Sequence, residues 1–90
     1  MKIKAPPLEL IVWDDVVSHS SGWISPEEVK DMDTWRMYTA GFVVEENGKE
    51  IKIMSTHSDP TKLEISYGHD TIIPAGWIVS RKVLRRNWWK

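Results

Sequence analysis

The sequence predicts a mainly β fold, a small and strongly bent five-stranded antiparallel barrel with one short helix after the first strand. Runs rich in β-branched and aromatic residues recur along the 90 residues, and an Asn-Gly pair separates two of them. One helix-start signal stands between the first run and the second. Because closing a short sheet removes exposed strand edges, we expect a barrel.

The first element is predicted at residues 8–13, LELIVW, which are apolar on both faces and therefore typical of a central strand. A short helix is predicted at residues 26–32. Ser25 can cap its first turn, and Pro26 suits the first helical position. Glu28 completes a capping box, and the residues after the helix are poor helix formers.

A long hairpin is predicted next, with strands at residues 34–44 and 50–56. Asn47-Gly48 is the turn signal, and we expect Gly48 to occupy a left-handed turn position. Gly41 inside the first strand predicts a bulge or a sharp bend, as small barrels need.

The remaining residues predict shorter elements. Residues 63–67, LEISY, are expected to form a short strand and residues 67–70 a break. Residues 71–84 predict a strand, a tight proline-centred turn and a last strand. We therefore expect one domain at 1–84, followed by a basic and aromatic tail at 85–90. This order of elements resembles the Src-homology/Sm-type small barrel, in which a one-turn helix commonly joins the last two strands.

Four segments carry a second resemblance: VWDD (12–15), SGWISPEEV (21–29), AGFVVEENGKEIKI (40–53) and TIIPAGWIVSRKVL (71–84). Together they resemble small uncharacterised bacteriophage proteins with a Trp-x-Asp, Gly-Trp and Ile-Pro pattern. The resemblance implies a phage origin and a host-cytoplasm setting, and it brings no assigned chemistry with it.

The composition predicts a cytoplasmic protein without cofactor, metal or catalytic site. There is no cysteine, and no apolar run approaches the ~20 residues of a membrane span. Adjacent side chains of a strand point to opposite faces, so Asp14 and Asp15 are not expected to converge as an acid–base pair. The three histidines, at 19, 57 and 69, lack the partner spacing of zinc sites, and no nucleophile or phosphate-loop motif occurs.

Six tryptophans against one phenylalanine are the positive signal, because tryptophan is enriched at interfaces. Trp13 and Trp35 lie in predicted strands, where core packing is the expected role. Trp77 is expected to pack over the end of the barrel. Trp23, beside a glycine in a polar loop, fits either a structural or a binding role. The adjacent pair at 88 and 89 follows a charged tail and needs a surface, provided by its own barrel, a neighbouring subunit or a partner.

The charges are divided unequally along the chain. Residues 1–70 contain all 13 acidic residues and seven basic ones, a net charge of −6, whereas residues 71–90 contain five basic residues and no acid, a net charge of +5. Such polarity favours head-to-tail self-association or an anionic ligand at one end, although the basic residues could also simply line the outer face of a last strand. The net charge of −1 argues against an extended nucleic-acid interface.

The sequence therefore predicts a non-catalytic binding protein that blunts a host function. Its partner would be a host protein or a small anionic ligand such as a defence nucleotide, because arginine binds phosphate and tryptophan stacks on bases or anchors protein interfaces. The alternative is an assembly component that forms a homo-oligomer or packs in a virion. The candidate binding residues are Trp23, Arg81, Arg85, Arg86, Trp88 and Trp89.

Overall fold

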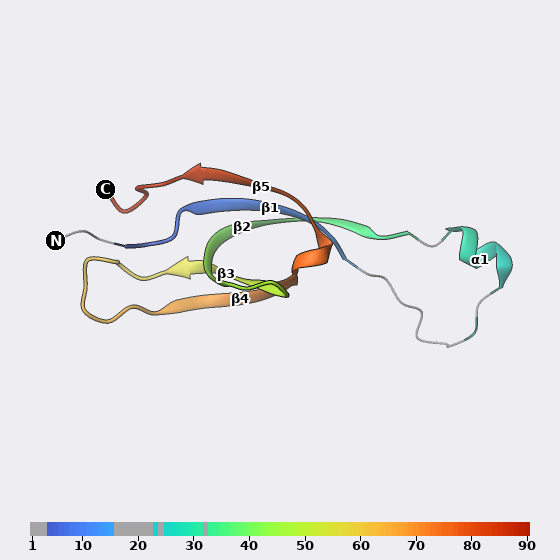
Figure 1. Ribbon diagram of the computed structural model, residues 1–90, viewed down its shortest axis with the longest axis horizontal. Helices are drawn as coiled ribbons and strands as arrows, with labels where there is room; N and C mark the ends of the chain where they lie inside the picture. The colour runs from blue at the N-terminus through green and yellow to red at the C-terminus, as the bar shows by residue number, and fades with distance from the viewer. Residues whose placement is uncertain (1–3, 16–22, 24, 32) are drawn as a thin grey trace.

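The five strands form one antiparallel sheet in the order β4-β3-β2-β1-β5 (Figure 1). The computed structural model describes residues 4–15, 23, 25–31 and 33–90. The predicted mainly β class, the antiparallel pairing and the short helix after the first strand are confirmed. In chain order the elements are β1 (Leu8–Asp15), α1 (Pro26–Asp31), β2 (Trp35–Glu46), β3 (Glu50–His57), β4 (Tyr67–Pro74), the 3₁₀ helix η1 (Ala75–Trp77) and β5 (Ile78–Arg85).

The sheet is strongly bent, but it is not closed, so "barrel" describes it only loosely. β4 and β5 are its two edges, and in the described part of the chain no strand pairing joins them. η1 turns the chain from β4 directly into β5 across this gap (Figure 1). Side-chain contacts replace the missing strand pairing: Arg81 of β5 binds Glu46 at the end of β2, which holds β5 near β2.

The bend is made in β2, which is 12 residues long and changes partner along its length. Its residues 35–42 pair with β1, whereas residues 42–46 pair with β3, with a register shift between Val43 and Glu45. Gly41 lies at the changeover. A Cβ at this position would come within 2.5 Å of the Met54 carbonyl oxygen, so only glycine allows β2 to lie this close to β3. The predicted bend at Gly41 is therefore confirmed.

The core lies between the two halves of the bent sheet. Alternate residues of the strands face it, as the period of a strand requires, and the buried side chains are those of Ile11, Trp13, Ile51, Ile53 and Ile73. The Trp77 ring stacks on the Trp13 ring with centroids 6.4 Å apart, so Trp77 closes one end of the core as predicted.

Trp35 corrects the expectation that it packs in the core, because 67% of it is exposed. It pairs with Asp15 where β1 ends, beyond the part of β2 that β3 covers. Among the residues that the structure describes, no strand pairs with the other side of β2 there to bury it. Trp35 is therefore exposed although it lies in a strand, because β3 pairs only with residues 42–46 of β2 and does not reach it.

α1 occupies residues 26–31, within the predicted range, and projects beyond the ends of β1 and β2 (Figure 1); Met32, the last residue of the predicted helix, lies outside the described residues. The predicted cap is present, since the Glu28 backbone N–H donates to the Ser25 hydroxyl oxygen over 3.2 Å. The helix lies away from the sheet, at the opposite end of the molecule from the two termini (Figure 1).

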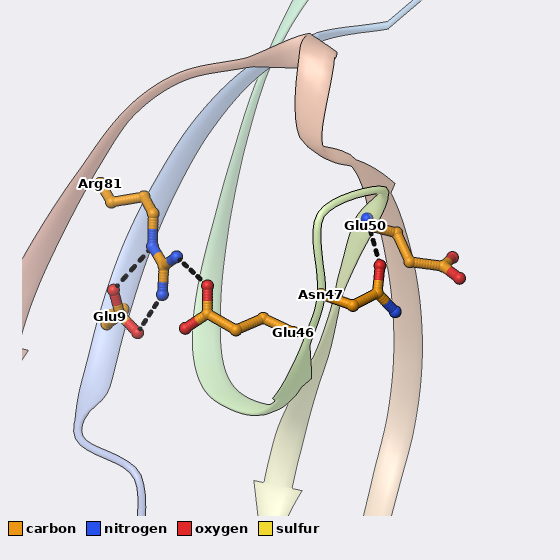
Figure 2. A network of polar contacts seen from close by, with 5 residues as sticks. All are labelled: Glu9, Glu46, Asn47, Glu50 and Arg81. Carbon is orange, nitrogen blue, oxygen red and sulfur yellow. Dashed lines mark hydrogen bonds and ion pairs between the residues drawn. The ribbon is translucent and has the colours of Figure 1, made fainter.

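The hairpin between β2 and β3 forms as predicted, but with a different turn. Its three-residue loop is held by the Asn47 side chain, whose oxygen accepts from the backbone N–H group of Lys49 at 2.8 Å. The same oxygen accepts from the backbone N–H group of Glu50 at 3.1 Å (Figure 2). The predicted left-handed position of Gly48 is wrong, because its φ lies outside the left-handed region. The asparagine cap replaces the two-residue turn that would have required it.

The predicted strand at 63–67 and break at 67–70 are also wrong. Residues 63–66 belong to the loop after β3, and β4 begins at Tyr67, which pairs with His57. The strand continues through Gly68, whose φ is not left-handed, and through His69, whose backbone has a φ of 58°. Pairing with β3 therefore outweighs the turn-like character of Gly68, His69 and Asp70.

Replacing Gly41 with alanine is expected to lower the free energy of unfolding by about 2 kcal/mol or more, because the added methyl group meets backbone atoms of Met54 that cannot rotate away. Urea unfolding followed by circular dichroism measures the loss. Gly76→Ala is the matched control, since nothing lies within 4 Å of its added Cβ. Equal losses from the two variants would contradict a special role for Gly41 in the bend.

Candidate functional site

Arg81, one of the predicted binding residues, is held by two carboxylates of the same chain (Figure 2). Its guanidinium binds Glu9 of β1 through two contacts, Nε to Oε1 at 3.1 Å and Nη2 to Oε2 at 3.0 Å. Nη1 donates to Glu46 Oε2 at the end of β2, at 2.9 Å. The hydrogen bonds to Glu9 and then to Glu46 raise the pKa of the Arg81 guanidinium above its usual value. Three N–H groups of the fork are therefore already used.

The position of Glu9 explains this arrangement. Glu9 is only 7% exposed, and a carboxylate removed from water is costly unless it is paired and hydrogen-bonded. The planar fork of Arg81 meets both of its oxygens, which a lysine ammonium cannot do. Arg81 thus joins β5 to β1 and to the bent end of β2, and it belongs to the structure more than to an open binding surface.

Trp88 also packs on its own chain. Its indole Nε1 donates to the Pro6 carbonyl oxygen at 2.8 Å, and its ring centroid lies 4.7 Å from that of Phe42 and 5.0 Å from that of His57. The Trp89 ring meets the Trp88 ring edge to face, with centroids 5.3 Å apart. The residues after β5 therefore turn back onto the sheet.

His57 is the centre of this aromatic cluster, formed by Phe42, His57, Tyr67, Trp88 and Trp89. Its ring contacts Phe42 at 5.4 Å and Tyr67 at 5.1 Å in addition to Trp88. Its Nδ1 donates to the Ser58 carbonyl oxygen over 2.6 Å, which leaves Nε2 as the acceptor in the neutral ring. The cluster is a second, smaller hydrophobic unit between the sheet and the last residues of the chain.

A pocket of about 470 Å³, here called the basic pocket, opens beside this cluster; it is lined by Lys4, Ala5, Pro6, Pro7, Arg86, Asn87 and Trp89. Its two walls come from opposite ends of the sequence. They meet because β1 and β5 pair antiparallel, with Leu8 opposite Arg85, so the residues before β1 lie beside those after β5. Figure 1 shows both termini at this end of the molecule.

The charge of the basic pocket is not neutralised from within the described part of the chain. Lys4 and Arg86 both line it, and neither forms an ion pair there, while no carboxylate is among the lining residues. Trp89 is half-buried and adds an indole ring to the wall. Two free cations beside an aromatic ring can bind a phosphate or carboxylate that carries a planar group.

The predicted site residues are thus only partly brought together. Arg86 and Trp89 line the basic pocket, and Arg85 immediately precedes them at the end of β5. Trp23 is 91% exposed and does not line the basic pocket. In the sequence it precedes α1, the helix at the other end of the molecule. The sequence did not point to the wall formed by residues 4–7, because only the pairing of β1 with β5 places that segment there.

The carboxylates and histidines considered as catalytic candidates have other surroundings. Asp14 pairs across the strands with Arg36, and His57 lies in the aromatic cluster. His19 falls outside the described residues. Among the residues that are described, no group of three His, Cys, Asp or Glu side chains could hold a metal ion.

No known protein family, curated protein or solved structure was found to match this chain. In the described part of the chain, none of the helices has the length and apolar character needed to cross a membrane.

Arg81→Leu is expected to lower the free energy of unfolding by about 2–4 kcal/mol, because it leaves the Glu9 carboxylate buried without its partner. The double variant Glu9→Leu/Arg81→Leu is expected to regain most of that loss, since it buries no charge. Urea unfolding of the two single variants and the double variant gives the coupling energy. Arg36→Leu, which breaks an exposed ion pair, is the control and is expected to cost less. A double variant less stable than Arg81→Leu would contradict this account.

Trp88→Ala is expected to lower the free energy of unfolding by about 2–3 kcal/mol, because it opens a hole between Phe42 and His57 and removes the bond to Pro6. Trp88→Phe keeps a ring and is expected to lose less. Trp89→Ala, which removes only the ring contact with Trp88 and leaves the contacts of Trp88 with Phe42 and His57 in place, should have the smallest effect. Thermal unfolding of the three variants tests the order, and a larger loss at position 89 than at 88 would show that the cluster is wrongly assigned.

Proposed function

We propose that this chain is a non-catalytic binding protein that holds a small anionic ligand with a planar ring, of which a nucleotide is the type case, in the basic pocket. The observation that carries the proposal is the meeting of Lys4, Arg86 and Trp89 around one pocket. Arg86 supplies a planar set of donors for phosphate, Lys4 adds a second positive charge, and Trp89 offers a face on which a base can stack.

The dimensions of the pocket support a small ligand. A volume of about 470 Å³ lies within the range of roughly 300–1,000 Å³ that small-molecule sites occupy. Pro6 and Pro7 fix the backbone of one wall, and the Trp88 ring supports Trp89 on the other. Walls that are ordered before binding reduce the entropy lost when the ligand is held.

The resemblance to small bacteriophage proteins supports a role inside an infected host. A protein that holds a signalling nucleotide without transforming it would lower the concentration that a host defence can sense. A host protein is the second candidate partner, because arginine and tryptophan are also the residues that anchor protein interfaces. Arg85, Arg86 and Trp89 form the part of the surface that such a partner would contact first.

Isothermal titration with mononucleotides, cyclic nucleotides and inorganic phosphate tests the proposal. We expect binding of at least one nucleotide, weakened roughly tenfold or more by Arg86→Ala and by Trp89→Ala, since a charged contact or a stacked ring each contributes about 1–3 kcal/mol. Binding should also weaken as ionic strength rises. Lys49→Ala, in the hairpin loop, is the matched control and should bind as the unmodified chain does.

Two results would contradict the small-ligand proposal. One is the absence of any heat of binding with all of these ligands. The other is binding whose affinity Arg86→Ala and Trp89→Ala leave unchanged. Capture of a host protein that depends on Arg86 and Trp89, without nucleotide binding, would favour the protein partner.

A further inference from the structure

The molecule is long and carries opposite charges at its two ends. Its extents are 61 × 22 × 21 Å. At the end with the termini lies the basic end, which we define as Lys4, Arg85, Arg86 and Lys90, and neither residues 4–7 nor residues 85–90 include an acid. At the opposite end lies the acidic end, the described residues 25–31 and 33–35, whose sequence contains four acidic residues, Glu27, Glu28, Asp31 and Asp33, and one base, Lys30, a net charge of −3.

These two ends cannot neutralise each other within one molecule. The Debye length is about 8 Å at physiological ionic strength, far less than the 61 Å length of the molecule. In the described part of the chain, Lys82, Arg85 and Arg86 have no carboxylate partner. The charges are therefore available to another molecule.

Apolar side chains are also exposed among these charges, both on β5, which leads to the basic end, and at the acidic end. On β5, Leu84 is 46% exposed between Lys82 and Arg85. Near the acidic end, Val29 and Trp35 are exposed by more than half of their surface. Charged groups around exposed apolar ones resemble the rim and the centre of a protein interface. β5 is moreover an edge strand of the sheet, so one side of its backbone is unpaired.

We propose that the exposed surface of β5, formed by Lys82, Leu84 and Arg85, docks the acidic end of a second copy of this chain. The positive side chains meet Glu27 and Glu28, and Leu84 meets the apolar side chains beside them. Because the two docking surfaces are different, a pair of copies keeps one surface of each kind unused, and the association is head to tail. Such contacts extend into chains or rings of copies instead of stopping at a symmetric dimer.

Charge reversal at each surface tests the proposal. Lys82→Glu/Arg85→Glu makes both surfaces acidic, and Glu27→Lys/Glu28→Lys makes both basic. Sedimentation velocity of the unmodified chain at submillimolar concentration should give a mass above the 10.5 kDa of one copy at about 0.01 M ionic strength and close to one copy at about 1 M, where the Debye length falls to about 3 Å. Each reversed variant alone should remain a single copy at both ionic strengths.

Mixing the two reversed variants in equal amounts is the decisive step, because it restores opposite charges between molecules. Association of the mixture but of neither variant alone supports the proposal, and it also shows that both variants fold. A single-copy mass for the unmodified chain at low ionic strength overturns the proposal. So does association that both reversals leave unchanged, or a mixture that stays dissociated while circular dichroism shows both variants folded.

The test of self-association can fail without the test of nucleotide binding failing, and the reverse. Neither reversal changes Lys4, Arg86 or Trp89, and the acidic-end reversal lies at the far end of the molecule. At protein concentrations low enough for both proteins to be single copies, ligand titration of Glu27→Lys/Glu28→Lys should therefore match that of the unmodified chain, whichever way the sedimentation result falls at higher concentration.

Discussion

The close contact of Gly41 with the backbone of Met54 is the constraint on which the rest of the fold depends. A flat five-stranded sheet has two exposed faces, and it can enclose a core only if one strand bends sharply. β2 makes that bend by passing from β1 to β3 at a residue with no side chain. As a result Ile11 of β1 lies in the same core as Ile53 of β3 and Ile73 of β4. A larger residue at position 41 would push apart the two layers that these isoleucines fill.

The bend in β2 also determines which charged side chains pair with each other. It carries Glu46 back toward β5, where Arg81 binds it together with the buried Glu9. A buried ion pair of this kind adds little stability compared with apolar packing, but it penalises any other position of β5, because a shift would leave Glu9 unpaired. We infer that the network fixes the last strand in place. Lys4, Lys82, Arg85 and Arg86 form no ion pair in the described part of the chain, so they remain available for binding.

The basic pocket and the β5 docking surface are neighbours, so the two proposed roles are coupled. A nucleotide beside Arg86 would bring negative charge close to Arg85 and weaken the attraction for an acidic end. Association of copies would in turn lower the positive potential that draws an anion to the pocket. Trp88 supports the basic pocket, because it packs the residues after β5 onto Phe42 and His57 and its ring contacts that of Trp89.

The sequence by itself determined the features that depend on near neighbours. The strand character of β1 and β3, the Ser25 cap, the Gly41 bend and the division of charge along the chain could all be predicted, because each can be read directly from the sequence. Only the tertiary structure decided that Trp35 is exposed, and that β4 runs through Gly68 and His69. It also decided that Arg81 is held by carboxylates and that residues 4–7 form half of a pocket. Each of these depends on pairing between strands distant in the sequence, and local composition carries no information about which strand a residue will lie beside.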